Sequence, residues 1–226
     1  MNLAELTRRF RVWAQDQVHP YLFSDEDVAD WMTDAQVQAA VRARLLFDDT
    51  TPAVCTVAVV PGVASYPLHP ALYELVLVRF KATGATCSIP LRIVSREWLT
   101  DHVRDWRDAT DWQGSSKRFC VQSETGLRIV PIPDEAGDLL IEGYRLPLNP
   151  LVNDTDKPEI HEASHEKLIQ WALHRAFSLP DTEGVDPNRA AAAEREFTAY
   201  FGPMPDADMR RMTREDEVQH NVSYPP

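Results

Sequence analysis

The stretch ARLLFDDTTPAVCTVAVV (residues 43–60) contains a change in the period of the apolar residues, and this change decides the fold. Before it, residues 25–46 carry apolar side chains at helical spacing, which predicts one long packed helix. After Pro52, the run at 53–60 is rich in β-branched residues and too short for a second long helix, so it predicts a strand. The chain is therefore expected to pass from a helical region into a β region near residue 50.

Two helices are predicted before this change. The first has an apolar stripe at spacings of three and four residues, formed by Leu3, Leu6, Phe10 and Trp13. Residues 19–23 include a proline and interrupt the pattern. Ser24 is followed directly by three acids, which the helix dipole favours in a first turn, so Ser24 is the expected N-cap of the second helix.

Short apolar runs alternate with turns over the middle of the chain. Strands are predicted at residues 53–60, 75–80, 89–94, 118–121, 126–132 and 139–144. A short helix capped by Ser95 lies among them. The short turns favour an antiparallel meander, because parallel strands need longer helical crossovers. Cys55, Cys87 and Cys120 lie in such runs and are expected to be reduced, buried thiols.

Two more helices are predicted after the strands. One begins at Pro158 or the next residue and runs to about 178, and the other begins with an N-cap at Asp186 and a proline at the first helical position. The four apolar stripes are most easily buried against each other. The expected fold class is therefore α+β: residues 1–50 and 158–202 form a small helical bundle, 51–157 an inserted antiparallel β-sheet region, and 203–226 an extended C-terminal tail.

The charge of the chain bears on its partners. The formal net charge is −12, whereas proteins that grip DNA phosphates usually present a basic face. The arginines nevertheless gather at both ends of the chain, so a nucleic-acid-binding module stays open as an alternative. No apolar run reaches the length of a membrane span, and the N-terminus lacks the pattern of a signal peptide. We therefore expect assembly in the cytoplasm and no membrane partner.

Residues 161–165 read HEASH and match the H-E-x-x-H motif of zinc peptidases. A zinc peptidase also needs a third protein ligand. In the extended form of the motif this ligand is a histidine further along the chain, and that position is occupied here by Trp171. His161 and His165 lie at the start of the predicted helix, where polar residues are common. We predict no catalytic residue, no metal and no cofactor, and a zinc metallopeptidase stays open as a second alternative.

The order of several segments resembles that of bacteriophage head-to-tail adaptor (connector) proteins, the portal-bound, tail-tubular-protein-A-like family. The resemblance covers roughly residues 1–201. It rests on SDEDVADWMTDAQ (24–36), YPLHPALYEL (66–75), PLRIVSREWLTDHVRDWRDATD (90–111), GLRIVPIPDEAGDLLIEGYRLP (126–147) and LVNDTDKPEIHEASHEKLIQWALHRAF (151–177). In this family the histidine and glutamate after the proline are a structural helix start. The segment after Gly202 is not part of the shared pattern.

The resemblance implies a structural virion protein at the head–tail junction. Such adaptors form a ring, commonly of about twelve copies, beneath the portal. The ring extends the DNA channel and carries the tail. The implied partners are further copies of the chain, the portal protein and a tail tube or nozzle protein. Genomic DNA is expected to pass through without specific binding, since an acidic protein around the channel would repel phosphates.

A ring of this kind needs two non-identical adhesive faces on each subunit. Aromatic residues outside the helical stripes are the predicted subunit-interface residues: Tyr21, Phe23, Trp106 and Trp112. The tail is expected to bind the portal or a neighbouring subunit. Its predicted anchors are Met209, Arg210, Arg211, Met212, Arg214 and Tyr224.

Overall fold

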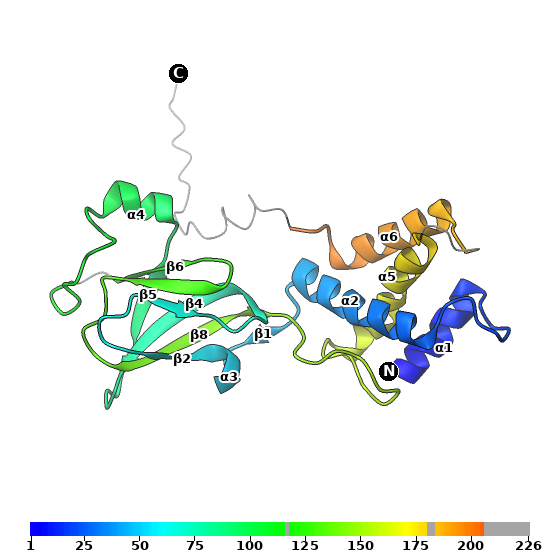
Figure 1. The fold of residues 1–226 in the computed structure, drawn as a ribbon, viewed down its shortest axis with the longest axis horizontal. Coiled ribbons are helices and arrows are strands. Elements are labelled where there is room, and N and C mark those ends of the chain that lie inside the picture. The colour runs from blue at the N-terminus through cyan, green and yellow to red at the C-terminus, as the bar shows by residue number, and fades with distance from the viewer. Residues whose placement is uncertain (116–117, 180–183, 206–226) are drawn as a thin grey trace, which may run out of the picture. The chain divides into compact units, whose positions relative to one another are not determined.

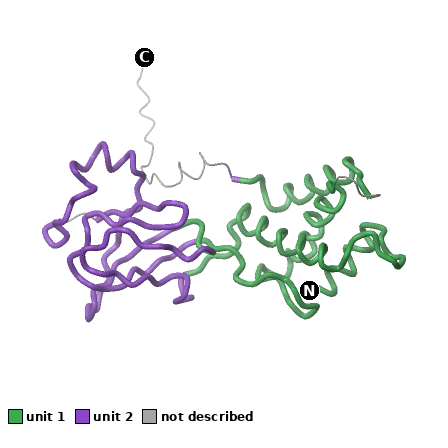
Figure 2. The backbone as a smooth tube through the Cα atoms, viewed as in Figure 1, with its two compact units in different colours: residues 1–48, 71–74, 144–204 green, residues 49–70, 75–143, 205–226 purple. Residues whose placement is uncertain are grey.

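The computed structural model of the chain describes residues 1–115, 118–179 and 184–205. The described residues are a mixture of helices and a curled β-sheet (Figure 1), which confirms the predicted α+β class. The chain divides into two compact units (Figure 2). Unit 1 contains residues 1–48, 71–74 and 144–204, and the described part of unit 2 contains residues 49–70 and 75–143 together with Pro205.

Unit 1 is built around four helices that share one hydrophobic core. They are α1 (Leu3–Ala14), α2 (Asp25–Ala43), α5 (His165–Phe177) and α6 (Pro187–Phe201). Helix α5 contacts the other three. The apolar stripe of each helix contributes to the core, for example Phe10 from α1, Met32 from α2 and Phe197 from α6, all with no exposed surface. Burial of these stripes, not helix propensity alone, stabilises the four helices.

The capping residues set where these helices begin. The Ser24 side chain accepts a hydrogen bond from the backbone N–H of Asp27 at 3.0 Å, and Asp186 accepts from the two N–H groups at positions 188 and 189. Both predicted N-caps are therefore confirmed. Asn2 caps α1 in a capping box with Glu5.

The sheet contains eight strands within the described residues. They are β1 (Phe47–Asp48), β2 (Thr56–Val59), β3 (Ser65–Pro67), β4 (Leu72–Ala82), β5 (Ile89–Ile93), β6 (Phe119–Gln122), β7 (Gly126–Val130) and β8 (Gly137–Arg145). Their order is β1-β8-β4-β5-β6-β7-β3, and β2 also pairs with β8. Strands β2, β3 and β7 have antiparallel partners, with Thr56 opposite Leu140 and Ser65 opposite Arg128.

The pairing of β5 with β6 is parallel, with Arg92 opposite Phe119. The prediction of a wholly antiparallel meander was therefore wrong at this point. The connection between these strands includes α4 (Arg96–His102), which gives the chain the length that a parallel crossover needs. A second core forms under this crossover, from Val94, Leu99, Trp106, Phe119, Val121 and Val130.

Three local predictions also need correction. Residues Pro52–Cys55 form a one-turn helix, α3, because Pro52 begins a turn before β2 starts at Thr56. The helix expected from Pro158 begins only at His165, after a short 3₁₀ helix at Glu162–Ser164. Cys87 lies exposed in a bend, whereas Cys55 and Cys120 are buried as expected.

No helix in the described ranges combines the length and the apolar content needed to cross a lipid bilayer.

Candidate assembly surfaces

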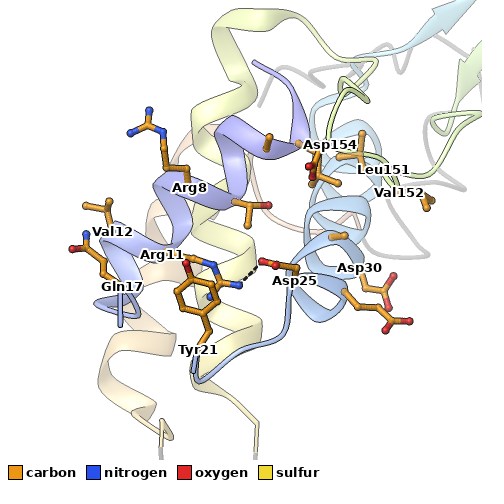
Figure 3. Close-up of a pocket in the computed structure, with 15 residues that line it drawn as sticks. Arg8, Arg11, Val12, Gln17, Tyr21, Asp25, Asp30, Leu151, Val152 and Asp154 are labelled. Carbon is orange, nitrogen blue, oxygen red and sulfur yellow. Dashed lines mark hydrogen bonds and ion pairs between the residues drawn. The ribbon is translucent and has the colours of Figure 1, made fainter. Parts of the chain in front are cut away.

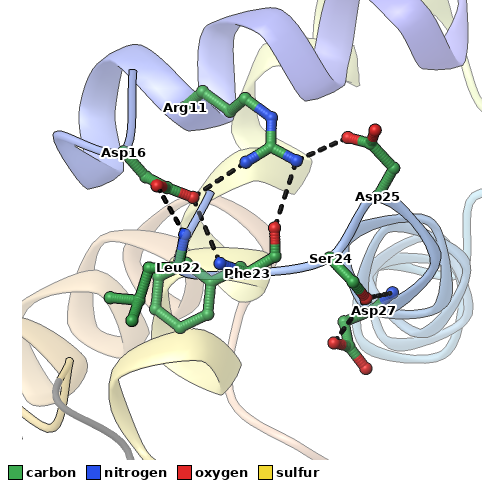
Figure 4. A network of polar contacts seen from close by, with 7 residues as sticks. All are labelled: Arg11, Asp16, Leu22, Phe23, Ser24, Asp25 and Asp27. Atoms are coloured by element: carbon green, nitrogen blue, oxygen red, sulfur yellow. Dashed lines mark hydrogen bonds and ion pairs between the residues drawn. The ribbon is translucent and has the colours of Figure 1, made fainter. Parts of the chain in front are cut away.

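A buried ion pair holds the corner between α1 and α2 (Figure 4). Arg11 on α1 is 6% exposed, and its guanidinium donates to the Asp16 carboxylate at 2.8 Å and to the backbone carbonyl of Phe23 at 3.2 Å. It also pairs with Asp25, which belongs to the first turn of α2. The Asp16 carboxylate accepts two further bonds, from the N–H groups of Leu22 and Phe23. These bonds satisfy the buried charges and fix the conformation of residues 16–25.

The corner that this pair holds carries several exposed apolar side chains. They form what we call the corner patch: Val12, Trp13, Val18, Tyr21 and Leu22. Val18 is the most exposed of them, at 81%. The guanidinium carbon of Arg11 lies 3.6 Å from the centroid of the Tyr21 ring. This cation–π contact restricts the orientation of the exposed ring. All five lie within residues 12–22, and exposed apolar side chains that gather on a surface are typical of a protein interaction site.

Residues at and just before the start of α6 lie against this corner. A Cβ built on Gly184 would lie 2.8 Å from the Leu22 side chain, and Arg189 donates to the carbonyl of Trp13 at 2.8 Å. Val185, next to Gly184, is 44% exposed. Segments from both ends of the sequence therefore lie side by side at this corner of unit 1, and both carry exposed apolar side chains.

A groove of about 780 Å³ runs beside this corner, between α1, the start of α2 and residues 151–154 (Figure 3). Its acidic side chains come from α2 and from the 151–154 segment: Asp25, Glu26, Asp30 and Asp154. Arg8 and Arg11 are its basic residues, and Arg11 is already paired. The groove therefore suits a basic or mixed peptide segment better than an anion.

The HEASH segment has a structural explanation in unit 1. His161 is the N-cap of the 3₁₀ helix, and its ring accepts a bond from the N–H of Ala163. His165 is 3% exposed, and its ring nitrogens contact the backbone carbonyls of Ile160 and Met1. Among the residues that the structure describes, no group of three or more His, Cys, Asp or Glu is arranged to hold a metal ion. Both rings are thus engaged with backbone atoms.

A second charged cluster anchors the end of β8 in unit 1. Arg145 donates to Asp48 and to Glu159, each at 2.7 Å. Burial by itself lowers the pKa of Arg145, but these bonds and charges outweigh it, and the net effect raises the pKa. The cluster therefore ties β1, β8 and the segment before α5 together.

The predicted interface residues lie in different environments. Tyr21 is 39% exposed and belongs to the corner patch. Phe23, Trp106 and Trp112 are buried inside their own units, where Phe23 packs edge-on against Phe10 and Trp31, and Trp112 against Phe80. These three offer little side-chain surface to a neighbour in this conformation. The predicted tail anchors lie outside the described residues: Met209, Arg210, Arg211, Met212, Arg214 and Tyr224.

Sequence reasoning missed most of the corner patch. Trp13 was expected in the apolar stripe of α1, but it is 37% exposed because Ala14 occupies the buried position instead. Arg11 belongs to the arginines that gather near the start of the sequence, and only the structure shows that its side chain is buried. A usable signal was present: Val18 lies in a short polar segment between two helices, where an apolar residue has no helical stripe to join.

Comparison with known families identifies the family to which the chain is similar. The family described as "SU10 adaptor protein" matches residues 1–219 of the chain. No curated protein matches it.

Proposed function

The chain belongs to the SU10 adaptor protein family, a family of bacteriophage head-to-tail adaptors, and on this premise we propose that it forms a ring beneath the portal at the capsid vertex. The ring would hold about twelve copies, extend the DNA channel and provide the platform for the tail. Membership in this family implies a structural, non-enzymatic role in the virion. The observation that carries the proposal is the family match, which spans both units.

The helical bundle of unit 1 is the part that we propose to face the portal or a neighbouring subunit. The corner patch supports this, because a ring subunit must present an adhesive surface that its own fold leaves uncovered. The groove beside the patch adds an acidic surface that suits a basic partner segment. Unit 2, with the inserted β region, would then face outward or toward the tail components.

The C-terminal segment is proposed as the second attachment. Residues 203–226 combine methionines and arginines with acids, and a segment that orders on binding can cover a large partner surface. We propose Met209, Arg210, Arg211, Met212, Arg214 and Tyr224 as its anchors. A chain that ends at Gly202 should keep its fold, since the described core of unit 1 lies before this residue, and should bind the portal more weakly.

The net charge of −12 supports a channel that does not hold DNA. Like charges repel phosphates, so the genome can slide through the ring during packaging and ejection. The isolated subunit should therefore show no tight, salt-sensitive binding to duplex DNA. A ring whose lumen is lined with arginines would contradict this part of the proposal.

Electron microscopy of the protein mixed with its portal tests the central proposal. The expected result is a ring bound coaxially to the portal, from a subunit that is monomeric or weakly associated alone. Absence of any portal-bound particle would overturn it. Equal binding by the full chain and by a chain ending at Gly202 would overturn the role of the tail alone.

A further inference from the structure

Unit 2 has a basic depression that contrasts with the acidic chain around it. Its volume is about 480 Å³, and its walls come from β3, β7, the start of α4 and the loop after α4. Three arginines line it, Arg96, Arg107 and Arg128, and its lining contains no acidic residue. We call it the arginine basin.

Two of these arginines, Arg107 and Arg128, are held in place by contacts with Trp106 and with each other. Trp106 is 5% exposed, and its ring lies 4.4 Å from the guanidinium carbon of Arg107 and 5.5 Å from that of Arg128. Arg128 also donates to the backbone carbonyl of Arg107 at 2.6 Å. Because stacking has already restricted Arg107 and Arg128, these two side chains lose less conformational entropy when they bind a ligand.

The positive charges of the three basin arginines are not balanced by acidic side chains among the described residues. In the described part of the chain, none of the three arginines forms an ion pair. The Nε of Arg128 is buried and has no hydrogen-bond partner among these residues. Ser65, Ser123 and Thr125 belong to the same lining, and the Ser123 hydroxyl donates to the backbone carbonyl of Gly126. Grouped guanidinium groups are typical of sites that bind carboxylates or phosphates.

The charge of the chain favours a carboxylate ligand over DNA. Three arginines cannot offset the repulsion between a subunit of net charge −12 and a polyanion. Trp106 is buried and offers no face for base stacking. An acidic peptide segment is therefore the better fit.

The sequence offers two runs of three consecutive acids. One, at 25–27, lies in the first turn of α2, where Asp25 pairs with Arg11 and Asp27 accepts from Ser24. The other, Glu215–Asp216–Glu217, lies beyond Pro205, the last described residue. We propose that the arginine basin binds this C-terminal acidic triplet of the same chain. The covalent link supports such binding, because a tether that spans the distance gives an effective concentration of roughly millimolar.

This docking would keep the C-terminal segment on the subunit until a partner competes for it. Release of the C-terminal segment by a partner rests on the proposed attachment of this segment to the portal. Binding of the acidic triplet to the arginine basin does not require the portal.

Fluorescence anisotropy with a labelled peptide of residues 206–226 tests the inference. The protein is the full chain with its own triplet neutralised by Glu215→Gln, Asp216→Asn and Glu217→Gln. We expect it to bind the peptide, and to bind a peptide with the same three changes at least about tenfold more weakly. The wild-type chain should bind the unmodified peptide at least about tenfold more weakly than the neutralised chain, because its own triplet competes.

Substitutions of the basin arginines provide a second test of the inference. Arg96→Gln, Arg107→Gln and Arg128→Gln together, in the neutralised chain, should abolish binding. Arg104→Gln is the matched control, since Arg104 is in the same loop, has a side chain that is 96% exposed and lies outside the basin. It should bind like its parent.

Three results would overturn the inference: equal binding of the charged and neutral peptides, equal binding by the wild-type and neutralised chains, or tight binding of a short oligonucleotide in place of the peptide. If the triple arginine variant fails to fold, the comparison of the two peptides still decides the matter. None of these outcomes bears on ring formation with the portal.

Discussion

At the scale of single residues, Arg11 and Asp16 determine the geometry of the corner patch. Both side chains are less than a tenth exposed, and together they bond to the backbone of residues 22 and 23. The corner is therefore held by polar contacts, while its apolar side chains point to solvent. Removal of one charge leaves the other buried without its partner.

We expect Arg11→Ala to lower the free energy of unfolding by about 3–5 kcal/mol, the usual cost of breaking a buried pair. Urea denaturation followed by circular dichroism measures this. Arg8→Ala is the control, because Arg8 is exposed on the same helix and should change stability by less than about 0.5 kcal/mol. A loss below about 1 kcal/mol for Arg11→Ala would mean that the pair is solvated.

The three cysteines should differ in reactivity. Burial raises the pKa of the Cys120 thiol well above its usual range, because the thiolate loses its hydration, so this thiol stays protonated at neutral and mildly alkaline pH. Cys55 is also buried, and Cys87 is exposed. Ellman's reagent should therefore react fast with one thiol in the native protein and with all three after unfolding. Cys87→Ser should remove the fast phase, and a fast phase that persists would contradict the assignment.

At the scale of elements, two helices of unit 1 begin with a serine in different roles. The Ser24 hydroxyl caps α2, whereas Ser164 precedes α5 without any side-chain capping bond. The two positions therefore separate the energy of capping from the effect of a serine at a helix start.

Ser24→Ala should destabilise the protein by about 1 kcal/mol, because the N–H of Asp27 loses its acceptor. Ser164→Ala should cost less than about 0.5 kcal/mol. Thermal or urea unfolding of the two variants measures the difference. Equal losses would show that the cap at Ser24 adds nothing beyond the packing of α2.

At the scale of the whole molecule, the corner patch is the surface that we expect to matter for assembly. Val18→Glu should leave the free energy of unfolding within about 0.5 kcal/mol of wild type, since the side chain is 81% exposed. It should reduce the fraction of portal particles that carry a ring, because a charge would be buried in the contact. Val60→Glu is the control, at a 56% exposed position in unit 2. Normal rings with Val18→Glu would exclude the patch from the interface.

The sequence by itself determined the features that depend on neighbours along the chain. The caps at Ser24 and Asp186 are visible because a capping side chain bonds to backbone two or three residues away. The spacing of apolar residues changes near residue 50, and this change separates the helices from the strands. It can be read from the sequence because the spacing also depends only on neighbouring residues. The order of the quoted segments was enough to point to the adaptor family.

Only the tertiary structure decided the features that depend on residues far apart in the chain. The parallel pairing of β5 with β6 could not be read from turn lengths, because it depends on how the crossover through α4 packs. The exposure of two tryptophans could not be predicted from the sequence either. Trp106 is buried beside arginines from two segments, while Trp13, next to the buried Ala14, is exposed to solvent. Whether Trp13 or Trp106 is covered depends on which distant residues the fold packs against it, and the residues next to it in the sequence do not indicate this.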